Sequence, residues 1–261
     1  MHTTAIEWLT GAVKRPLAIV SDVHGNLEAF TAVLAAIDQL KIQTIYSLGD
    51  TVGYGPDPEA CTRLAMERCQ VRVMGNHEYA LLKLDDFNFN PQARQALEWS
   101  RARLEAAGLL EAATDLKPYY QRGRLLFVHG SVHDTVFEYV QETDGNGFSA
   151  FDEVINTLTN EFTGISICFV GHNHRPFLAT KEGFIHPHDD INEFSVVDEK
   201  LYVSVGSVGQ PRDGDPRACF VVFDGETIRY HRVAYDPAPT VAKIQAAGLP
   251  EVLGQRLLKG L

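Results

Sequence analysis

The sequence lacks any apolar run near the about 18–20 residues that a membrane-spanning helix needs. It also lacks a CxxC pair, and its few cysteines are scattered over 261 residues at Cys61, Cys69, Cys168 and Cys219. Such sparse cysteines are typical of reduced thiols in a cytoplasmic protein, most of them packed in a core. The first residues place their positive charges after a short, mixed apolar stretch, which argues against a secretory signal. We therefore expect a cytoplasmic protein with no membrane association.

No basic run is present either. The sequence has 23 Lys and Arg residues and 34 Asp and Glu residues, so the formal net charge is −11 and the pI is about 5.3. A field of that sign repels long nucleic acids and anionic membranes. With 45% hydrophobic residues and no repeat, low-complexity tract or linker, the chain is typical of one globular domain over 1–261, with an N-terminal extension at 1–15.

Strand-like and helix-like patterns alternate in the first part of the chain. Short runs rich in branched residues at 17–21, 44–49 and 71–75 are separated by helical spacing over 27–40 and 58–69. Strand–helix–strand units of these lengths predict a largely parallel sheet. Further along, the patterns predict a helix over 91–107, strands over 125–130, 165–172, 200–207 and 219–225, and one or two helices over 239–260. The crowding of strands after residue 184 favours antiparallel or mixed pairing there.

Five of these strand-like runs end in side chains that can bind a metal ion. They are Asp22 and His24, Asp50, Asn76 and His77, His129, and finally His172 and His174. In open α/β sheets the carboxyl ends of the strands form the ligand site, so we expect these side chains to converge. A single histidine at a strand end is more often a hydrogen-bonded core residue, and Gly-Asn-His is also compatible with a simple turn. The ordered set favours a metal site.

The donor types indicate which ions and which substrate would suit such a site. Oxygen and nitrogen donors without thiolate are more typical of a site for Mn²⁺, Fe or Zn²⁺ than of a structural zinc site, which uses cysteines. A bridging carboxylate can hold two such ions about 3.5–4 Å apart and lower the pKa of a shared water. Two divalent ions beside two aspartates leave a positive pocket in an acidic protein. Phosphate is the anion that such a pair clamps while metal-bound hydroxide attacks in line.

The motifs that carry these residues resemble the signature of the calcineurin-like metallophosphoesterase superfamily. The matching segments are DVHGN (22–26), GDTVGYG (49–55), GNHE (75–78), VHGS (128–131) and GHNH (171–174). The later segment 203–226 is similar to the closing part of the small bacterial phosphodiesterases of that superfamily. The resemblance implies an α/β fold, a four-layer α/β/β/α sandwich of two mixed sheets flanked by helices. It places a dimetal site at the edge where the loops of the two sheets meet.

The resemblance also implies a role for each motif residue. Asp22, His24 and His174 would hold one divalent ion. Asn76, His129 and His172 would hold the other. Asp50 would bridge the two ions, and His77 would be the catalytic residue that stabilises the transition state or protonates the leaving group.

Other residues near the motifs have weaker signals. Tyr54 and Arg212 are candidates for substrate binding, although a packed ring and a surface ion pair explain them as well. Glu78 is either a residue that orients a ligand or a carboxylate at a helix N-terminus. The inserted segment 134–163 follows a ligand-bearing strand, so we expect it to form a substrate wall. The His- and Asp-rich segment 186–190 mimics a metal site but is more typical of a surface hairpin loop.

The sequence therefore favours a dimetal-dependent phosphodiesterase that acts on small, nucleotide-derived diesters. A phosphomonoesterase, a protein phosphatase or a dinucleoside polyphosphate hydrolase would use the same chemistry. A non-catalytic scaffold that keeps the fold is the alternative of another class. The expected partner is a small phosphoester, with no long nucleic acid and no membrane, and a homo-oligomer is compatible with the sequence.

Overall fold

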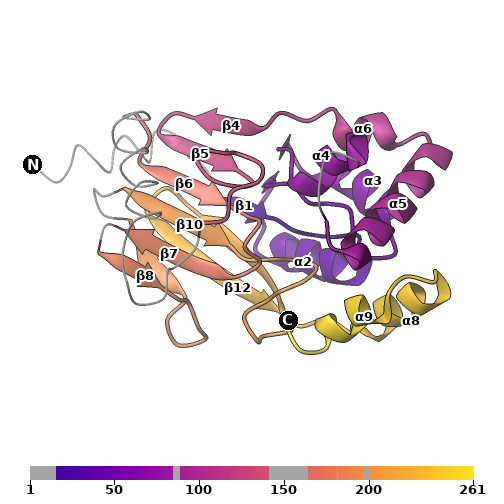
Figure 1. Ribbon diagram of the computed structural model, residues 1–261. Helices are drawn as coiled ribbons and strands as arrows, with labels where there is room; N and C mark the ends of the chain where they lie inside the picture. The colour runs from indigo at the N-terminus through magenta and orange to yellow at the C-terminus, as the bar shows by residue number, and fades with distance from the viewer. Residues whose placement is uncertain (1–15, 85–88, 141–163, 181, 197–199) are drawn as a thin grey trace, which may run out of the picture.

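The computed structural model describes residues 16–84, 89–140, 164–180, 182–196 and 200–261. Two six-stranded mixed sheets lie face to face, with helices outside them and at one end (Figure 1). The first sheet has the order β3-β2-β1-β11-β12-β9. Its strands are β1 (Leu17–Val20), β2 (Thr44–Ser47), β3 (Val71–Arg72), β9 (Glu193–Ser195), β11 (Ala218–Phe223) and β12 (Thr227–Val233). Strands β1, β2 and β3 pair in parallel, as expected, and β11, β12 and β9 add antiparallel neighbours.

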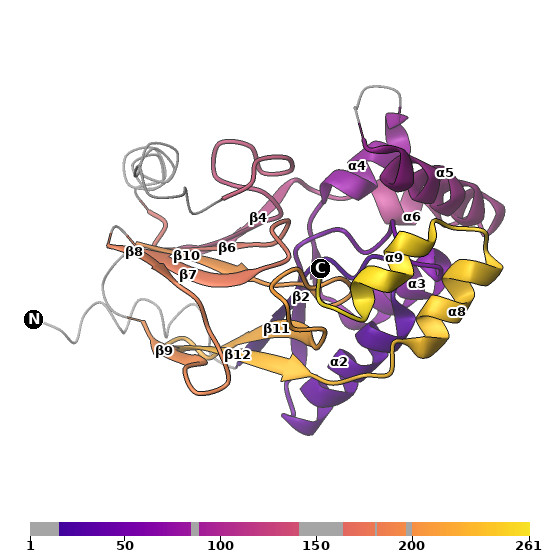
Figure 2. The ribbon, with the colours of Figure 1, turned by 60° about the horizontal axis from the view of Figure 1, so that its bottom comes forward.

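The second sheet has the order β4-β5-β6-β10-β7-β8. Its strands are β4 (Tyr119–Arg122), β5 (Leu125–Val128), β6 (Ile167–Val170), β7 (Pro176–Thr180), β8 (Gly183–Ile185) and β10 (Leu201–Val205). Strands β5, β6 and β10 run parallel, whereas β4, β7 and β8 pair antiparallel with their neighbours. Figure 2 shows the two sheets as separate layers.

The main core lies between the two sheets, where apolar side chains of the central strands of both sheets meet. These strands are apolar on their outer faces as well. In β1, Leu17 and Ile19 point into this core, while Ala18 and Val20 point to the outer face. Period-two alternation of a strand that is buried on both sides produces this division. Phe127 and Phe169 stack in the same inter-sheet core with ring centroids 5.2 Å apart.

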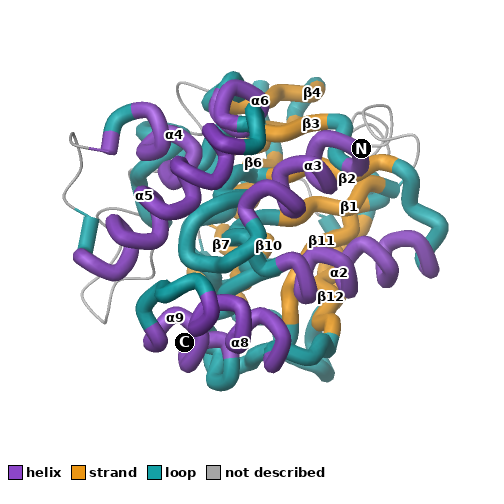
Figure 3. The backbone as a smooth tube through the Cα atoms, turned by 90° about the vertical axis from the view of Figure 1, so that its right-hand side faces the viewer, coloured by secondary structure: helices purple, strands orange, loops and turns teal. Residues whose placement is uncertain are grey.

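Helix α2 (Leu27–Gln39) and helix α3 (Pro58–Arg68) cover the outer face of the first sheet. The Asn26 side chain caps α2 by accepting a hydrogen bond from the Ala29 amide, and Phe30, Val33 and Ile37 pack on the sheet. The remaining helices are α4 (Asn76–Leu82), α5 (Pro91–Ala106), α6 (Leu110–Thr114), α8 (Ala238–Ala246) and α9 (Glu251–Leu257). Seen from their end of the molecule, α4 and α5 lie on one side of a group of loops and α8 and α9 on the other (Figure 3).

The expected α/β fold of two mixed sheets flanked by helices is confirmed. The outer face of the second sheet is apolar, and Val132 and Val140 pack on it. Residues 141–163, which hold most of the inserted segment, and residues 1–15 lie outside the described residues. In the described part of the chain, no helix is both long and apolar enough to cross a membrane.

The boundaries differ from the prediction at one functional position. The third strand ends at Arg72 rather than at residue 75, and Asn76 begins helix α4. This helix has seven residues, which is too short for a helical period to stand out in the sequence.

Candidate metal centre

The seven predicted ligands meet where the loops of both sheets converge. Asp22 and His24 follow β1, Asp50 follows β2, Asn76 begins α4, His129 follows β5, and His172 and His174 follow β6. None of these residues is more than 7% exposed. The two sheets are tied together here, since the His172 amide donates to Asp22 Oδ2 at 3.1 Å. The fold therefore gathers, in one buried place, residues that span 150 positions of the chain.

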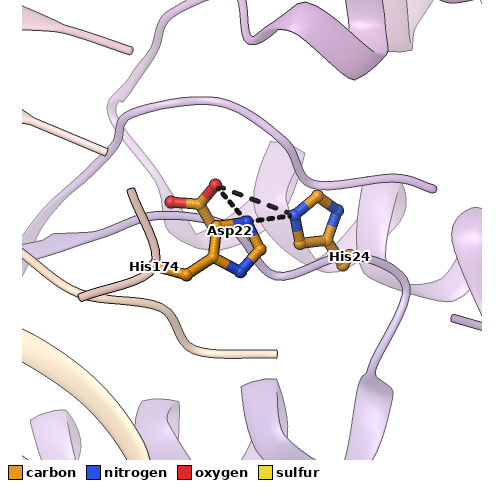
Figure 4. Close-up of side chains that lie close together, drawn as sticks. All are labelled: Asp22, His24 and His174. Carbon is orange, nitrogen blue, oxygen red and sulfur yellow. Dashed lines mark hydrogen bonds and ion pairs between the residues drawn. The ribbon is translucent and has the colours of Figure 1, made fainter. Parts of the chain in front are cut away.

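Asp22, His24 and His174 form the first group of donor atoms, and they point toward one another (Figure 4). The two histidine Nε2 atoms lie 3.0 Å apart. Asp22 Oδ1 lies 3.2 Å from His174 Nε2 and 3.7 Å from His24 Nε2. Ligands bound at about 2.0–2.2 Å to one ion are about 3.0–3.5 Å apart, so this spacing fits a single cation.

Asn76, His129 and His172 form the second group. His129 Nε2 lies 3.0 Å from Asn76 Oδ1 and 3.1 Å from His172 Nδ1. His129 and His172, together with Asp50, are a second set of donor atoms that could hold an ion. Asn76, His129 and His172 are the residues that the family resemblance assigns to one ion, and they lie together here.

Asp50 lies between the two groups. Its Oδ2 atom is 3.7 Å from His24 Nε2 in the first group and 3.4 Å from His129 Nε2 in the second. Its other oxygen, Oδ1, accepts a hydrogen bond from the His77 amide at 2.9 Å, which fixes the carboxylate. One carboxylate oxygen that faces both groups is the arrangement that bridges two ions.

Hydrogen bonds behind the histidines orient their metal-facing nitrogens. In three of the histidines, Nδ1 forms a hydrogen bond with a backbone carbonyl oxygen. These bonds join His24 to Val52 at 3.1 Å, His129 to Leu48 at 2.7 Å, and His174 to Gln210 at 2.5 Å. A carbonyl only accepts, so Nδ1 donates and the Nε2 lone pair is left for a cation. His172 is reversed, because its Nε2 meets the Phe137 carbonyl at 3.1 Å and its Nδ1 faces the centre.

The ligand loops have an unusual backbone. Five of the seven ligands have positive φ: Asp22 (54°), His24 (49°), Asp50 (53°), His172 (63°) and His174 (56°). Both members of the pair Asp22 and His24, and both members of the pair His172 and His174, thus have left-handed φ. Such strained backbone clusters at functional sites, where the surrounding structure maintains it.

The charges of the site also suit cations. Burial would raise the pKa of Asp22 and Asp50, but neighbouring histidines hold the pKa of both carboxyls well below the usual value. Burial, with His129, lowers the pKa of His172 to about 3, and burial also lowers the pKa of His24. His24 and His172 are thus neutral imidazoles beside two carboxylates at neutral pH. At His129 burial also lowers the pKa, but the Asp50 carboxylate outweighs it and raises that pKa to about 9. Asp22 Oδ1 is buried without a hydrogen-bond partner, as expected of an oxygen that binds a cation.

His77 lies at the edge of the bridging carboxylate. Its Nε2 is 4.0 Å from Asp50 Oδ2, farther than His24 or His129. Burial lowers the pKa of His77 to about 4, so the ring is neutral at neutral pH. A Cβ atom on Gly53 would lie 2.0 Å from His77 Nδ1, and Gly53 has a φ of +87°. The ring therefore occupies space that only a glycine leaves.

Glu78 contributes more than the sequence indicated. Its Oε2 accepts hydrogen bonds from the amides of Asp50 at 2.8 Å and Gly75 at 3.0 Å, and its Oε1 accepts one from Thr51 at 2.7 Å. Both sequence-based interpretations hold, since the carboxylate caps α4 and also fixes the loop of the bridging aspartate. The signal that could have decided this is the Glu at the third position of a helix that begins at Asn76.

Tyr54 and Arg212 lie together beside the centre. The Tyr54 ring is 4.6 Å from the rings of both His24 and His77, and the Arg212 guanidinium is 5.8 Å from the Tyr54 centroid. Sequence reasoning missed Tyr139. Its ring stacks on His172 with centroids 3.7 Å apart, and it remains 45% exposed. No periodic pattern marks residues 134–140, so only the fold reveals this contact.

The segment 186–190 behaves as a surface loop. Residues 188 and 191 form an isolated antiparallel bridge, and Asp189 forms an ion pair with Arg217 at 2.9 Å. Among the described residues, no group of metal-competent donors includes a member of this segment.

The family model for the calcineurin-like phosphoesterase superfamily domain matches residues 16–227 of this chain. The chain belongs to the calcineurin-like phosphoesterase superfamily. An uncharacterized protein of Methanocaldococcus jannaschii is 33% identical over 255 residues, which cover 95% of this chain and 99% of that protein. The metallophosphoesterase of Sphaerobacter thermophilus has a similar structure, with a TM-score of 0.79 and 35% identity, covering 95% of this chain and 99% of that one.

A hypothetical protein of Pyrococcus horikoshii shares the fold, with a TM-score of 0.76 and 19% identity over 94% of this chain and 98% of that chain. As a calcineurin-like phosphoesterase, the chain is a metal-dependent phosphoester hydrolase. Its Asp and His groups could hold metal ions in the arrangement described above.

Proposed function

We propose that this calcineurin-like phosphoesterase holds two divalent ions, Mn²⁺, Fe or Zn²⁺, and hydrolyses small phosphodiesters derived from nucleotides. One observation carries the proposal: the predicted donors lie in two compact groups, and Asp50 Oδ2 faces both of them. The Asn and His donors exclude a purely carboxylate Mg²⁺ or Ca²⁺ cage, and the absence of thiolate among the seven donors excludes a structural cysteine site.

The chain's own residues would divide the work as follows. Asp22, His24 and His174 hold one ion, Asn76, His129 and His172 the other, and Asp50 both. The ions, when bound, supply positive charge for the phosphate and lower the pKa of water. His77, neutral and fixed against Gly53, holds a proton on one ring nitrogen. Nε2, which faces Asp50 Oδ2 at 4.0 Å, is the atom placed to stabilise the transition state or protonate the leaving group.

The surroundings of the centre support a substrate with an aromatic group. Tyr139 lies on a metal-ligand ring and keeps nearly half of its surface exposed. An exposed aromatic face at that position can stack on a base or another planar leaving group. Its segment, 134–140, contains the described part of the predicted substrate wall. The net charge of −11 favours a small phosphoester over long nucleic acid as the partner.

Hydrolysis of bis-p-nitrophenyl phosphate and p-nitrophenyl phosphate by the Mn²⁺-loaded protein tests the proposal. We expect two ions per chain by elemental analysis and faster turnover of the diester. Activity on neither compound, with less than one ion per chain, would instead support the scaffold alternative.

Arg212 favours a second candidate, a phosphatase for monoesters, phosphoproteins or dinucleoside polyphosphates. Its guanidinium contacts Gln210 Oε1 at 2.8 Å and pairs with no carboxylate of the described residues. A monoester dianion gains more from such a cation than a diester monoanion does. If this candidate is correct, Arg212→Ala slows monoester turnover far more than diester turnover. Equal losses on both substrates would contradict it.

A further inference from the structure

A cavity opens beside the loop that carries the metal ligand His174. It has a volume of about 470 Å³, and the start of β7, the segment after β8 and the loop between β10 and β11 line it. Its lining includes Arg175, His186, Arg212 and Asp213. This volume lies within the roughly 300–1,000 Å³ of typical small-molecule sites and exceeds what one phosphate group fills.

Arg175 and Arg212 give this cavity a positive wall. Arg175 Nε donates to the Arg212 carbonyl at 2.7 Å, and the Arg212 amide donates to the His174 carbonyl at 3.1 Å. The Arg175 side chain is thus held by the backbone of Arg212, which is in turn bonded to the backbone of the metal ligand His174. Within the described ranges, neither guanidinium has a carboxylate partner. Among the lining side chains the carboxylate is that of Asp213, which is already in an ion pair with Arg232, and the chain end at Leu261 also lines the cavity.

Arg212 connects the cavity to the metal centre. Its guanidinium lies over the Tyr54 ring, and that ring contacts His24 and His77. Arg212 therefore lines the cavity and also contacts a ring that packs against the metal centre. In a chain with a net charge of −11, two guanidiniums without a carboxylate partner at one cavity wall form a local site for an anion.

We propose that the cavity binds a second phosphate group of the substrate, held by Arg175 and Arg212 while the first phosphate reacts at the metal centre. The substrate class is then a nucleotide that carries two phosphate groups. Planar guanidiniums recognise phosphate through paired N–H donors, and the cavity has room for the sugar that joins the two groups. This inference rests on the proposed function, because it names the substrate of the same site.

A matched pair of esters tests the inference. The p-nitrophenyl esters of thymidine 5′-phosphate and thymidine 3′,5′-bisphosphate differ by one phosphate. For the metal-loaded wild-type protein we expect KM to be roughly tenfold lower for the bisphosphate ester, as one charged hydrogen-bonded contact provides. In Arg175→Ala and Arg175→Gln this advantage disappears, and Arg175→Lys keeps part of it. An unchanged KM ratio in Arg175→Ala would overturn the inference.

Arg63→Ala is the matched control. Arg63 is an exposed arginine on α3 with no carboxylate partner among the described residues, so its removal changes the net charge equally. We expect this variant to keep the wild-type KM ratio. A ratio that falls as much in Arg63→Ala as in Arg175→Ala would show that only net charge matters and would overturn the site.

Binding without turnover separates the two proposals. Calorimetric titration of the metal-free chain with thymidine 3′,5′-bisphosphate and thymidine 5′-phosphate should show tighter binding of the bisphosphate that Arg175→Ala removes. If that difference is found but neither ester is hydrolysed after metal loading, the second phosphate site stands and the proposed function fails. If both esters are hydrolysed but neither KM nor affinity depends on Arg175, the function stands and this inference fails.

Discussion

Two segments of this chain each carry two histidines separated by one residue, but within the part of the chain that the structure describes, only one of them lies among other possible metal ligands. The motif at 171–174 contributes His172 and His174 to the metal centre, where both are at most 5% exposed. The segment at 186–190 has two histidines as well, followed by two aspartates, yet the Asp189 side chain is 70% exposed and pairs with Arg217. A short list of residue types therefore does not define a ligand set.

The difference lies in what surrounds each segment. His172 and His174 sit after a buried parallel strand, have positive φ, and meet donors from three other loops. Segment 186–190 follows the edge strand β8, where no other loop brings donors to it within the described residues. A candidate metal site therefore needs strand ends that converge, because only convergence brings buried donors from distant positions together.

Replacing Asp50, whose carboxylate faces both groups of donors, should have the largest effect on activity and metal content. Asp50→Asn takes away the negative charge that faces both groups, so we expect kcat/KM to fall at least about a thousandfold, which is roughly 4 kcal/mol of transition-state stabilisation. Steady-state kinetics and elemental analysis should show this loss together with fewer than two ions per chain. Retention of both ions with activity within tenfold of wild type would contradict the bridging role.

Replacing His77 should separate catalysis from metal binding inside the centre. His77→Gln keeps a polar side chain of similar reach but cannot transfer a proton, so we expect kcat to fall about 10²–10⁴-fold while two ions remain bound. Kinetics and metal content measured on the same sample check this. Loss of an ion would identify His77 as a ligand, since His77 also forms a group of possible metal donors with His24 and Asp50.

Gly53→Ala should show how closely the protein packs that ring. The added Cβ would overlap His77 Nδ1 at 2.0 Å, so we expect kcat to fall about tenfold to a hundredfold with metal content unchanged. Gly108→Ala is the control, because Gly108 also has positive φ (+65°) but has nothing within 4 Å of the added atom. Both variants should lose about 1 kcal/mol of stability in denaturant unfolding. Equal kcat for the two would disprove the packing argument.

The smallest effect is expected at the surface loop. The double variant His188→Ala/Asp189→Asn breaks an exposed ion pair with Arg217, which contributes at most about 1 kcal/mol. Metal content and kcat/KM should equal those of wild type, and the melting temperature should change by only a few degrees. A lost metal ion would mean that this segment, contrary to its exposure, also binds metal.

Much of the site was predictable from the sequence because each ligand follows a short apolar run, and runs of this kind form adjacent parallel strands. The same reasoning missed contacts without a periodic signal. It also missed strand β12, although buried Ile228 and Tyr230 alternate there with Arg229 and His231. The Phe137 carbonyl and the Tyr139 ring on His172 belong to a segment with no pattern at all.

By itself, the sequence determined which possible metal donors come together, because donor type and the order of strand ends are local properties. Only the tertiary structure decided which nitrogen of each histidine faces the centre, since a backbone carbonyl from another loop holds the opposite nitrogen. It also placed Arg175 and Arg212 beside one cavity, an arrangement produced by hydrogen bonds between residues 37 or more positions apart. Such contacts depend on how the two sheets pack, and no stretch of sequence encodes them alone.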